Sequence, residues 1–326
     1  MKILVTGGAG YIGSFMTKML LNEGYDVVVF DSLERGYRET VDSRSEFVKG
    51  DLRELSDASH LFVTRNIDAV MHFASYISVE ESENEPSKYY ENNVLGSKNL
   101  FQTAYEAGVR NFIFSSSAAV YGNPEVIPIP EDHQTNPTSE YGKNKLEMEN
   151  VLKSLRAKDP SISFVSLRYF NAAGASLDGT MGENHNPETH LIPLAIQSIV
   201  DDSGFSLYGA DYDTPDGTCI RDYIHVLDLC EAHLLALSKI SKEPGGYVYN
   251  VGTGVGHSNR EVLKIVEKVA RRKLRLIEGA RRMGDADRLV ADPQKIKSDL
   301  GFSPKYSDLD TVVGTAWKWH AKKSQT

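Results

Sequence analysis

A tyrosine and a lysine four residues apart, Tyr141 and Lys145, are the side chains in this sequence best suited to moving a proton. On a helix this spacing places both side chains on one face. A free tyrosine has a pKa of about 10, but a neighbouring ammonium group and a positively charged cofactor ring favour the phenolate. Three serines at 115–117 precede the pair, and one of their hydroxyls can join Tyr141 at a substrate. Because Tyr-x-x-x-Lys pairs also occur by chance on surface helices, this pair indicates chemistry only together with other features.

A glycine-rich turn near the start of the chain is the second such feature. Gly7-Gly-Ala-Gly-Tyr-Ile-Gly13 lies between an expected strand and an expected helix, and it contains G-x-G-x-x-G at Gly8, Gly10 and Gly13. Glycines allow a tight turn and let backbone N–H groups approach a pyrophosphate, which the N-terminus of the following helix also attracts. The turn therefore predicts a dinucleotide cofactor.

Asp31 indicates which dinucleotide is bound. It ends the second expected strand, 18 residues after Gly13, where an acid accepts hydrogen bonds from the adenosine ribose and repels the additional phosphate of NADP. We therefore predict NAD, although the nearby Arg35 is the residue that would favour NADP. Asp51-Leu52 and Phe73-Ala74 follow two further strands, at the sheet edge where ligands bind.

The elements that must position these residues alternate along the first half of the chain. Short apolar strands are expected at 2–6, 26–30, 46–49, 68–72, 111–115 and 163–168, and helices at 11–23, 55–65, 87–107 and 140–155. Continuous rather than alternating apolar strands are typical of a parallel sheet covered on both faces. The pattern predicts an α/β fold with a Rossmann-like, doubly wound parallel sheet.

After residue 171 the alternation ends, which predicts a smaller, mixed α/β substrate-binding domain. Loops rich in Gly, Asn, Asp and Pro alternate there with helices near 191–200, 227–237, 258–272, 293–300 and 309–319, and with a strand near 247–251. We expect an NAD-binding domain over residues 1–171, to which segments around 225–251 return, and a mainly substrate-binding domain over residues 172–326.

Composition excludes several classes of protein. The 326 residues carry a formal net charge of −9, are 25% charged and 40% hydrophobic, and contain two cysteines. This is the composition of a globular protein, and its negative charge argues against nucleic acid as a partner. With no signal peptide and no apolar run of about 18 residues, we expect a cytoplasmic protein with no membrane contact and two reduced thiols.

In this order, the glycine turn, the serines and the Tyr-Lys pair make the sequence similar to the extended short-chain dehydrogenase/reductase family. Within it, the resemblance is to the UDP-glucose 4-epimerase (UDP-galactose 4-epimerase) group. It extends through VTGGAGYIG (5–13), VMHFA (70–74), YYENNV (89–94), NFIFSSSAAVYG (111–122), YGKNKL (141–146), LRYFNAAG (167–174), DGTCIRDYIHV (216–226), YNVGTGVG (249–256) and RRMGD (281–285).

The resemblance implies transient oxidation at sugar carbon 4 by bound NAD, with non-stereospecific return of the hydride, and no metal. The implied catalytic residues are Ser117, Tyr141 and Lys145. The implied NAD contacts are Gly7, Gly10, Tyr11, Ile12, Gly13, Asp31, Asp51, Leu52, Phe73, Ala74, Asn92, Tyr141, Lys145 and Phe170. The implied UDP-sugar contacts are Ser117, Tyr141, Asn171, His190, Leu191, Tyr208, Arg221, Arg282 and Asp285.

Three positions depart from the pattern of this group. Ile77 stands where many members have a cofactor-contacting lysine, and His190-Leu191 stands where Asn-Leu is common, so His190 either donates to the diphosphate or is a packed histidine. Leu289 stands at a position thought to limit the sugar's 2-substituent, and its intermediate size leaves N-acetylated sugars open. Arg221 has an alternative interpretation, an internal ion pair with Asp222.

The same residues argue against some related functions and leave others open. Nucleotide-sugar dehydratases need an acid and a base where this chain has Ala118 and Ala119, so we expect no dehydration. Epimerases of UDP-N-acetylhexosamines or UDP-uronic acids remain alternatives. A non-catalytic NAD-sensing regulator would usually have lost the tyrosine or the lysine. The resemblance also implies a homodimer, in which the helices expected at 87–107 and 140–155 form a four-helix bundle across a two-fold axis.

Overall fold

The computed structural model describes residues 1–282 and 285–323, and the chain separates into two compact units. Unit 1 comprises Met1–Tyr121, Thr135–Arg168 and Cys230–Tyr249, and unit 2 comprises Gly122–Gln134, Tyr169–Leu229 and Asn250–Thr326, apart from the residues that are not described. Across the described ranges, no helix combines the length and the apolar character needed to span a membrane.

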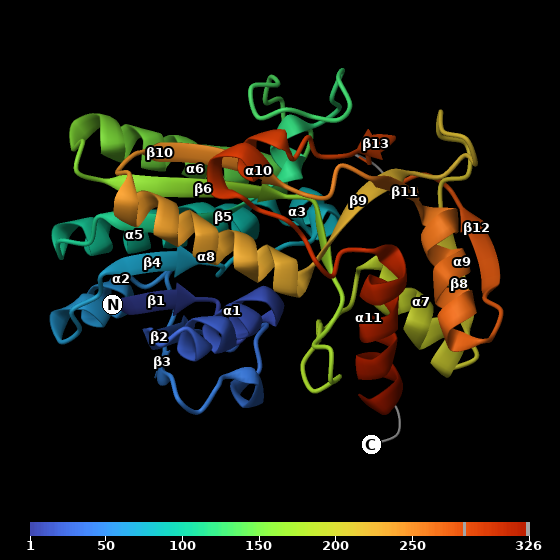
Figure 1. Ribbon diagram of the computed structural model, residues 1–326, viewed down its shortest axis with the longest axis horizontal. Helices are drawn as coiled ribbons and strands as arrows, with labels where there is room; N and C mark the ends of the chain where they lie inside the picture. Colours follow the sequence, from blue (N-terminus) through green and yellow to red (C-terminus); the bar gives the residue numbers. More distant parts are fainter. Residues whose placement is uncertain (283–284, 324–326) are drawn as a thin grey trace. The chain divides into compact units, whose positions relative to one another are not determined.

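Unit 1 is built on a seven-stranded sheet in the order β10-β6-β5-β4-β1-β2-β3 (Figure 1). Its strands are β1 (Lys2–Thr6), β2 (Asp26–Asp31), β3 (Glu46–Lys49), β4 (Ala69–His72), β5 (Asn111–Ser117), β6 (Ser163–Tyr169) and β10 (Gly246–Val251). β1 pairs in parallel with β2 and β4, β2 with β3, and β4 with β5. The predicted Rossmann-like parallel sheet is confirmed.

Helices cover both faces of this sheet. One face packs on α2 (Leu55–Val63), α5 (Ser97–Glu106) and α6 (Glu140–Lys158), in a core that includes Leu4, Phe30, Phe112 and Leu152. The opposite face carries α1 (Tyr11–Asn22) and α8 (Val226–Lys242), which cross the front of the sheet in Figure 1. The burial of both faces explains why the strands read as continuous apolar runs.

The helix predicted over residues 87–107 is interrupted. α3 (Val79–Asn84) and α4 (Pro86–Tyr89) precede a wider π-helical segment, Tyr90–Gly96, before α5 begins. Within that segment the Asn93 side chain accepts a hydrogen bond from Tyr76 N (2.8 Å) and donates one to Tyr76 O (3.0 Å). These two bonds tie the segment to the neighbouring loop, and such π-helical turns often occur at functional sites.

Unit 2 combines two small sheets with helices. β9 (Ile220–His225) pairs with β7 (Asn171–Ala173), β11 (Gly256–Ser258) and β13 (Arg288–Leu289), and β8 (Gly204–Tyr208) pairs with β12 (Arg275–Gly279). Its core joins α7 (Leu191–Val200), α9 (Asn259–Ala270) and α11 (Leu309–Lys323), and α10 spans Gln294–Leu300. A capping box at Ser258 and Glu261 begins α9.

Candidate active site

The glycine turn connects β1 to α1 by a backbone that tolerates no side chains at key positions. Gly7 has a φ of +73°, and a Cβ on it would lie 2.5 Å from the Ala74 backbone nitrogen. A Cβ on Gly13 would lie 2.2 Å from the Gly7 carbonyl oxygen. α1 starts at the N-cap residue Gly10 with no side-chain cap and no acid in its first turn. This end of α1 has the properties of an anion-binding site.

Asp31 is joined to this turn. Its carboxylate accepts hydrogen bonds from the backbone N–H groups of Ala9 (3.0 Å) and Leu33 (2.8 Å). Burial raises the pKa of Asp31, and the two backbone bonds act in the opposite direction. Arg35, the residue that would favour NADP, forms an ion pair with Glu81 at 2.9 Å. A buried carboxylate joined to the glycine turn, with Arg35 paired to Glu81, fits the ribose of NAD better than the phosphate of NADP.

The remaining predicted cofactor contacts of unit 1 follow neighbouring strands. Phe73 continues β4, donates its N–H to Thr6 O (3.0 Å) and lies against the His233 ring, with centroids 4.9 Å apart. Asp51 follows β3 and binds the Arg53 guanidinium, which holds the pKa of Asp51 below its usual range. Asn92 lies in the π-helical segment and donates to Asn93 Oδ1 (2.9 Å). Phe170 belongs to unit 2.

Tyr141 and Lys145 share the first turns of α6 and are both buried, with 8% and 4% exposure. Lys145 Nζ donates to Ser115 O (2.9 Å) and lies 5.6 Å from the centre of the Tyr141 ring. Burial raises the pKa of Tyr141 to about 12, while a hydrogen bond with the Ser117 side chain lowers it. Burial lowers the pKa of Lys145 to about 7. Burial therefore disfavours the charged form of each group, whereas a phenolate and an ammonium formed together would stabilise each other.

Two features of α6 hold this pair in place. The Ser139 hydroxyl caps the helix by accepting from Gly142 N (3.1 Å). A Cβ on Gly142 would lie 2.6 Å from Ala119 O, so only glycine allows α6 to come this close to the 3-10 turn Ala118–Tyr121. The glycine inside the Tyr-Gly-Lys-Asn-Lys motif thus sets the distance between the Tyr-Lys pair and the end of β5.

One turn further along α6, sequence reasoning missed a buried polar network. Glu149 accepts hydrogen bonds from Ser116 Oγ (2.6 Å) and, through both carboxylate oxygens, from Arg168 Nε (2.8 Å) and Nη2 (2.7 Å). Arg168 Nη1 donates to the Tyr121 hydroxyl (2.9 Å). The available signal was an arginine inside an otherwise buried strand, because a buried guanidinium requires a partner.

Unit 2 brings the predicted diphosphate-binding residues together in pairs. Arg221 on β9 donates to Ala286 O (2.8 Å) and lies 3.5 Å from Asp285 Oδ1. Arg282 lies over the Tyr208 ring, with its guanidinium carbon 4.4 Å from the centroid. Met283 and Gly284, which belong to the same motif, lie outside the described residues.

The alternative interpretation of Arg221, an ion pair with Asp222, does not describe the contacts that the structure gives Asp222. This fully buried carboxylate accepts from the backbone N–H groups of Thr253 (2.9 Å), Gly254 (3.0 Å) and Ala291 (3.2 Å). Because side chains alternate between the two faces of a strand, Arg221 and Asp222 point away from each other. Asn171 on β7 also contacts Asp222, donating to its backbone carbonyl (3.1 Å). Leu191 begins α7, and His190 is its N-cap residue.

Comparison with known proteins identifies the family. The sequence profile of the NAD dependent epimerase/dehydratase family matches residues 3–252. The chain belongs to this family. Over 321 residues it is 47% identical to the UDP-glucose 4-epimerase of Lactobacillus helveticus, covering 98% of this chain and 97% of that relative.

Solved structures of two UDP-glucose 4-epimerases are similar to this member of the epimerase/dehydratase family over nearly their whole length. The protein from Brucella ovis, in complex with NAD, has a TM-score of 0.92 and 43% identity, covering 97% of each chain. The protein from Bifidobacterium longum, in complex with NAD⁺ and UDP, has a TM-score of 0.94 and 37% identity, covering 99% of this chain and 98% of that one.

Proposed function

We propose that this protein is an NAD-dependent UDP-glucose 4-epimerase that interconverts UDP-galactose and UDP-glucose. The observation that carries the proposal is the arrangement of the buried Tyr141 and Lys145 and the half-buried Ser117 at the start of α6 and the end of β5, in a chain 47% identical to an epimerase. NAD fits unit 1 for two reasons. The glycine turn has no side chains that would keep a pyrophosphate away from its backbone N–H groups, and the buried carboxylate of Asp31 is hydrogen-bonded to this turn.

When bound, NAD accepts a hydride from carbon 4 of the sugar and returns it to either face of the ring, a chemistry that no side chain supplies. The cofactor is regenerated in each cycle. We assign its phosphates to the glycine turn and the N-terminus of α1, and its adenosine ribose to Asp31. The nicotinamide end is assigned to Lys145, with Phe73, Ala74 and Asn92 as further contacts.

We assign proton transfer to Tyr141, which takes the proton of the sugar 4-hydroxyl and returns it after the hydride comes back. Its phenolate needs support because the pKa of Tyr141 is raised by burial to about 12, even with the opposing effect of the Ser117 hydrogen bond. The Lys145 ammonium provides that support, and the Ser117 hydroxyl holds the same sugar oxygen. Lys145 is held by the Ser115 carbonyl, so its charge stays at one position.

We assign the UDP moiety to unit 2. A diphosphate carries about two negative charges, and guanidinium groups match its oxygens. Arg221 and Arg282 supply these groups, Asp285 orients Arg221 through their 3.5 Å contact, and Tyr208 supports Arg282 from below its guanidinium plane. Asn171, His190 and Leu191 complete the proposed set.

Among the alternatives, the sugar specificity depends on Leu289. It lies on β13 directly opposite Arg221 of β9, which places the proposed specificity residue next to a proposed diphosphate contact. An epimerase of UDP-N-acetylhexosamines or UDP-uronic acids would use the same reacting groups with a different pocket at this position. A non-catalytic NAD sensor would not require the buried Tyr141–Lys145 arrangement.

The test is to incubate the purified protein with UDP-galactose and follow the anomeric protons by NMR, first without and then with added NAD⁺. We expect UDP-glucose to appear, and we expect Tyr141→Phe to abolish turnover while retaining bound NAD. Tyr25→Phe, a tyrosine of unit 1 outside the site, serves as the matched control. If the protein converts UDP-N-acetylglucosamine or a UDP-uronic acid but not UDP-galactose, the assigned substrate is wrong and is replaced by that sugar nucleotide. Full activity of Tyr141→Phe would refute the catalytic assignment.

We also propose that the protein is a cytoplasmic homodimer that binds neither nucleic acid nor membranes. The face formed by α5 and α6 supports the dimer, because a hollow of about 540 Å³ lies between these helices and is lined in part by Phe101, Val151 and Leu155. Leu95, at the end of the π-helical segment, is 43% exposed. A four-helix bundle formed across a two-fold axis would bury these apolar side chains.

A further inference from the structure

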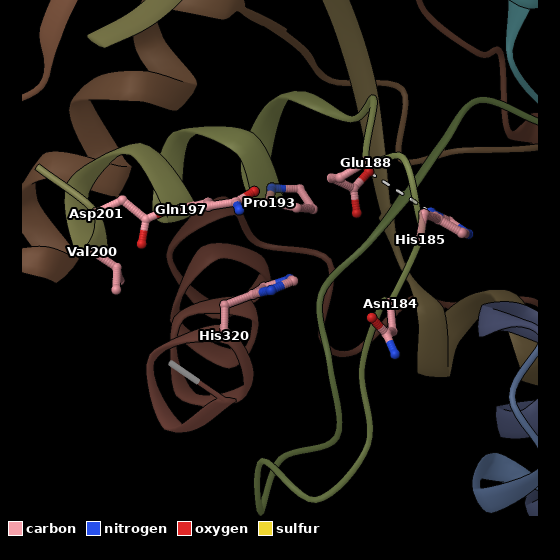
Figure 2. Close-up of a pocket in the computed structure, with 8 residues that line it drawn as sticks. All are labelled: Asn184, His185, Glu188, Pro193, Gln197, Val200, Asp201 and His320. Carbon is pink, nitrogen blue, oxygen red and sulfur yellow. Dashed lines mark ion pairs between the residues drawn. The ribbon is translucent and has the colours of Figure 1, made fainter. Parts of the chain in front are cut away.

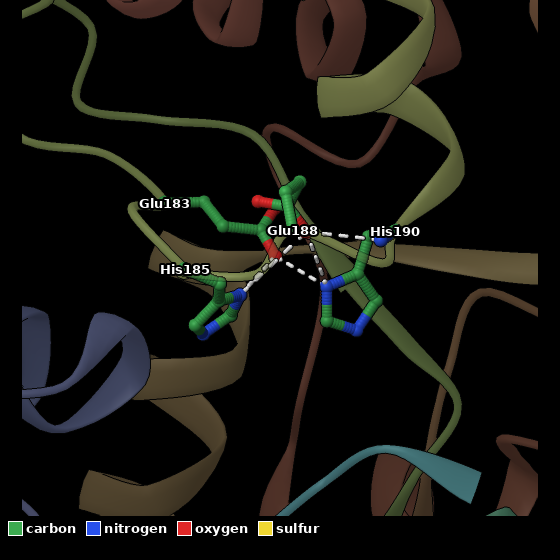
Figure 3. A group of neighbouring side chains, drawn as sticks. All are labelled: Glu183, His185, Glu188 and His190. Atoms are coloured by element: carbon green, nitrogen blue, oxygen red, sulfur yellow. Dashed lines mark hydrogen bonds and ion pairs between the residues drawn. The ribbon is translucent and has the colours of Figure 1, made fainter. Parts of the chain in front are cut away.

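Four metal-ligating side chains converge in the loop that precedes α7. Glu183, His185, Glu188 and His190 each direct one ligand atom towards a common centre, and these atoms all lie within 4.8 Å of one another (Figure 3). Glu183 Oε1 lies 3.0 Å from His185 Nδ1 and 2.6 Å from His190 Nδ1. Glu188 Oε1 lies 3.2 Å from His190 Nδ1 and 3.8 Å from His185 Nδ1.

The separations of 3.0 Å and 3.2 Å are close to those of a tetrahedral metal site, whereas 2.6 Å is shorter and 3.8 Å is longer. Imidazole nitrogens and carboxylate oxygens bind Zn²⁺ at about 2.0–2.2 Å, so neighbouring ligand atoms around the ion stand about 3.3 Å apart. The Glu183 Oε1 atom is buried, and its contacts with the two imidazole nitrogens lack the alignment of hydrogen bonds. Glu188 Oε1 and His190 Nδ1 form a hydrogen bond (3.2 Å), and the short contacts of Glu183 with both imidazoles bring all four ligand atoms around one shared point.

The surrounding structure holds this ligand set in place. Trp319 Nε1 on α11 donates to Glu183 O (2.8 Å) and so restrains the backbone at the most buried ligand. Glu188 Oε1 accepts from the backbone nitrogens of Thr189 (2.8 Å) and His190 (2.9 Å), which fixes its rotamer. Such outer contacts orient metal ligands in known sites.

An ion could reach the cluster through an adjoining pocket. A cavity of about 260 Å³ is lined by His185 and Glu188 of the cluster together with Asn184, Pro193, Gln197, Val200, Asp201 and His320 (Figure 2). The charge also balances, because one divalent cation and two neutral imidazoles offset the two carboxylates. Mixed nitrogen and oxygen ligands favour Zn²⁺ over Mg²⁺ or Ca²⁺, which prefer oxygen alone.

We propose that Glu183, His185, Glu188 and His190 bind one divalent transition-metal cation, with Zn²⁺ the best match, and that the ion fixes the loop leading into α7. Neither the ion nor its binding is needed for hydride or proton transfer. One consequence rests on the proposed function: a metal on His190 Nδ1 leaves the proton on Nε2, which makes the ring a fixed donor for a diphosphate oxygen.

The experiment uses the untagged full-length protein, dialysed against a chelator and then titrated with Zn²⁺ by calorimetry in the absence of any UDP-sugar. We expect about one Zn²⁺ per chain and a rise in melting temperature of about 5 °C or more, with no response to Mg²⁺. His185→Asn should lose at least about nine tenths of the bound Zn²⁺. His60→Asn, at an exposed histidine of α2, is the matched control and should bind as the unaltered chain does.

Two outcomes would overturn the proposal. If the unaltered chain binds no Zn²⁺, the cluster is a network of two imidazolium groups and two carboxylates. If His185→Asn binds as much Zn²⁺ as the unaltered chain, the ion lies elsewhere. Circular dichroism checks that His185→Asn is folded, and Glu188→Gln replaces it if it is not. Because binding is measured without substrate, the result stands whether or not the protein epimerises UDP-galactose.

Discussion

We predict that Glu149→Gln strongly destabilises unit 1. Glu149 is fully buried and Arg168 is 3% exposed, and the carboxylate receives two parallel hydrogen bonds from the guanidinium at 2.8 Å and 2.7 Å. A glutamine has the same shape, but it removes the negative charge and keeps only one acceptor oxygen. The variant would therefore remove the negative charge that Glu149 places against the buried Arg168 guanidinium.

The size of the effect follows from burial. Removing one partner of a buried ion pair typically costs about 3–5 kcal/mol of unfolding free energy, because the remaining charge is desolvated and uncompensated. For a unit of this size, that corresponds to a decrease in melting temperature of about 6 °C or more. Replacing both residues, as in the double variant Glu149→Met/Arg168→Met, should recover much of the loss, because no charge is then buried.

The assay is thermal unfolding followed by circular dichroism. Glu147→Gln is the matched control on the same helix, because Glu147 pairs with Lys98 at 2.6 Å while both side chains are more than a third exposed. Exposed pairs contribute about 0–1 kcal/mol, so this control should change the melting temperature little. If Glu149→Gln loses no more stability than Glu147→Gln, the buried pair does not hold α6 against β6 as we argue.

Three further predictions test the site and the assembly. Gly7→Ala should lose bound NAD and about 1–3 kcal/mol of stability because its Cβ meets Ala74 N, whereas Gly24→Ala, which also has a positive φ but an open surrounding, should retain NAD. Burial lowers the pKa of Lys145 from 10.5 to about 7, so the unfolded chain binds the additional proton between these values. The stability of the unaltered protein relative to Lys145→Met should therefore fall by up to about 1.4 kcal/mol per pH unit as the pH drops through that window, and parallel pH profiles would refute this. Val151→Glu should shift the protein from dimer to monomer in sedimentation, and an unchanged dimer would place the interface elsewhere.

Local sequence patterns predicted the parts of the candidate site whose geometry depends on residues close together in the sequence. The glycine turn, the strand ends and the Tyr141–Lys145 spacing are all set within a few residues, because turns and helix faces are local geometry. The parallel sheet was also predictable, since burial on both faces leaves an apolar run in each strand. β12 was not predictable, because all five of its residues are exposed and its sequence therefore shows no pattern of buried positions.

By itself, the sequence determined the Rossmann-like sheet, the dinucleotide turn and the candidate reacting groups. Only the tertiary structure decided which polar groups meet across long separations. It paired Arg168 with Glu149, placed Arg221 beside Asp285 rather than Asp222, and gathered four ligating side chains before α7. The physical reason is that a buried charge takes as its partner whichever group the packed backbone brings within hydrogen-bond reach. That distance is set by how helices and strands pack, not by the spacing of residues along the chain.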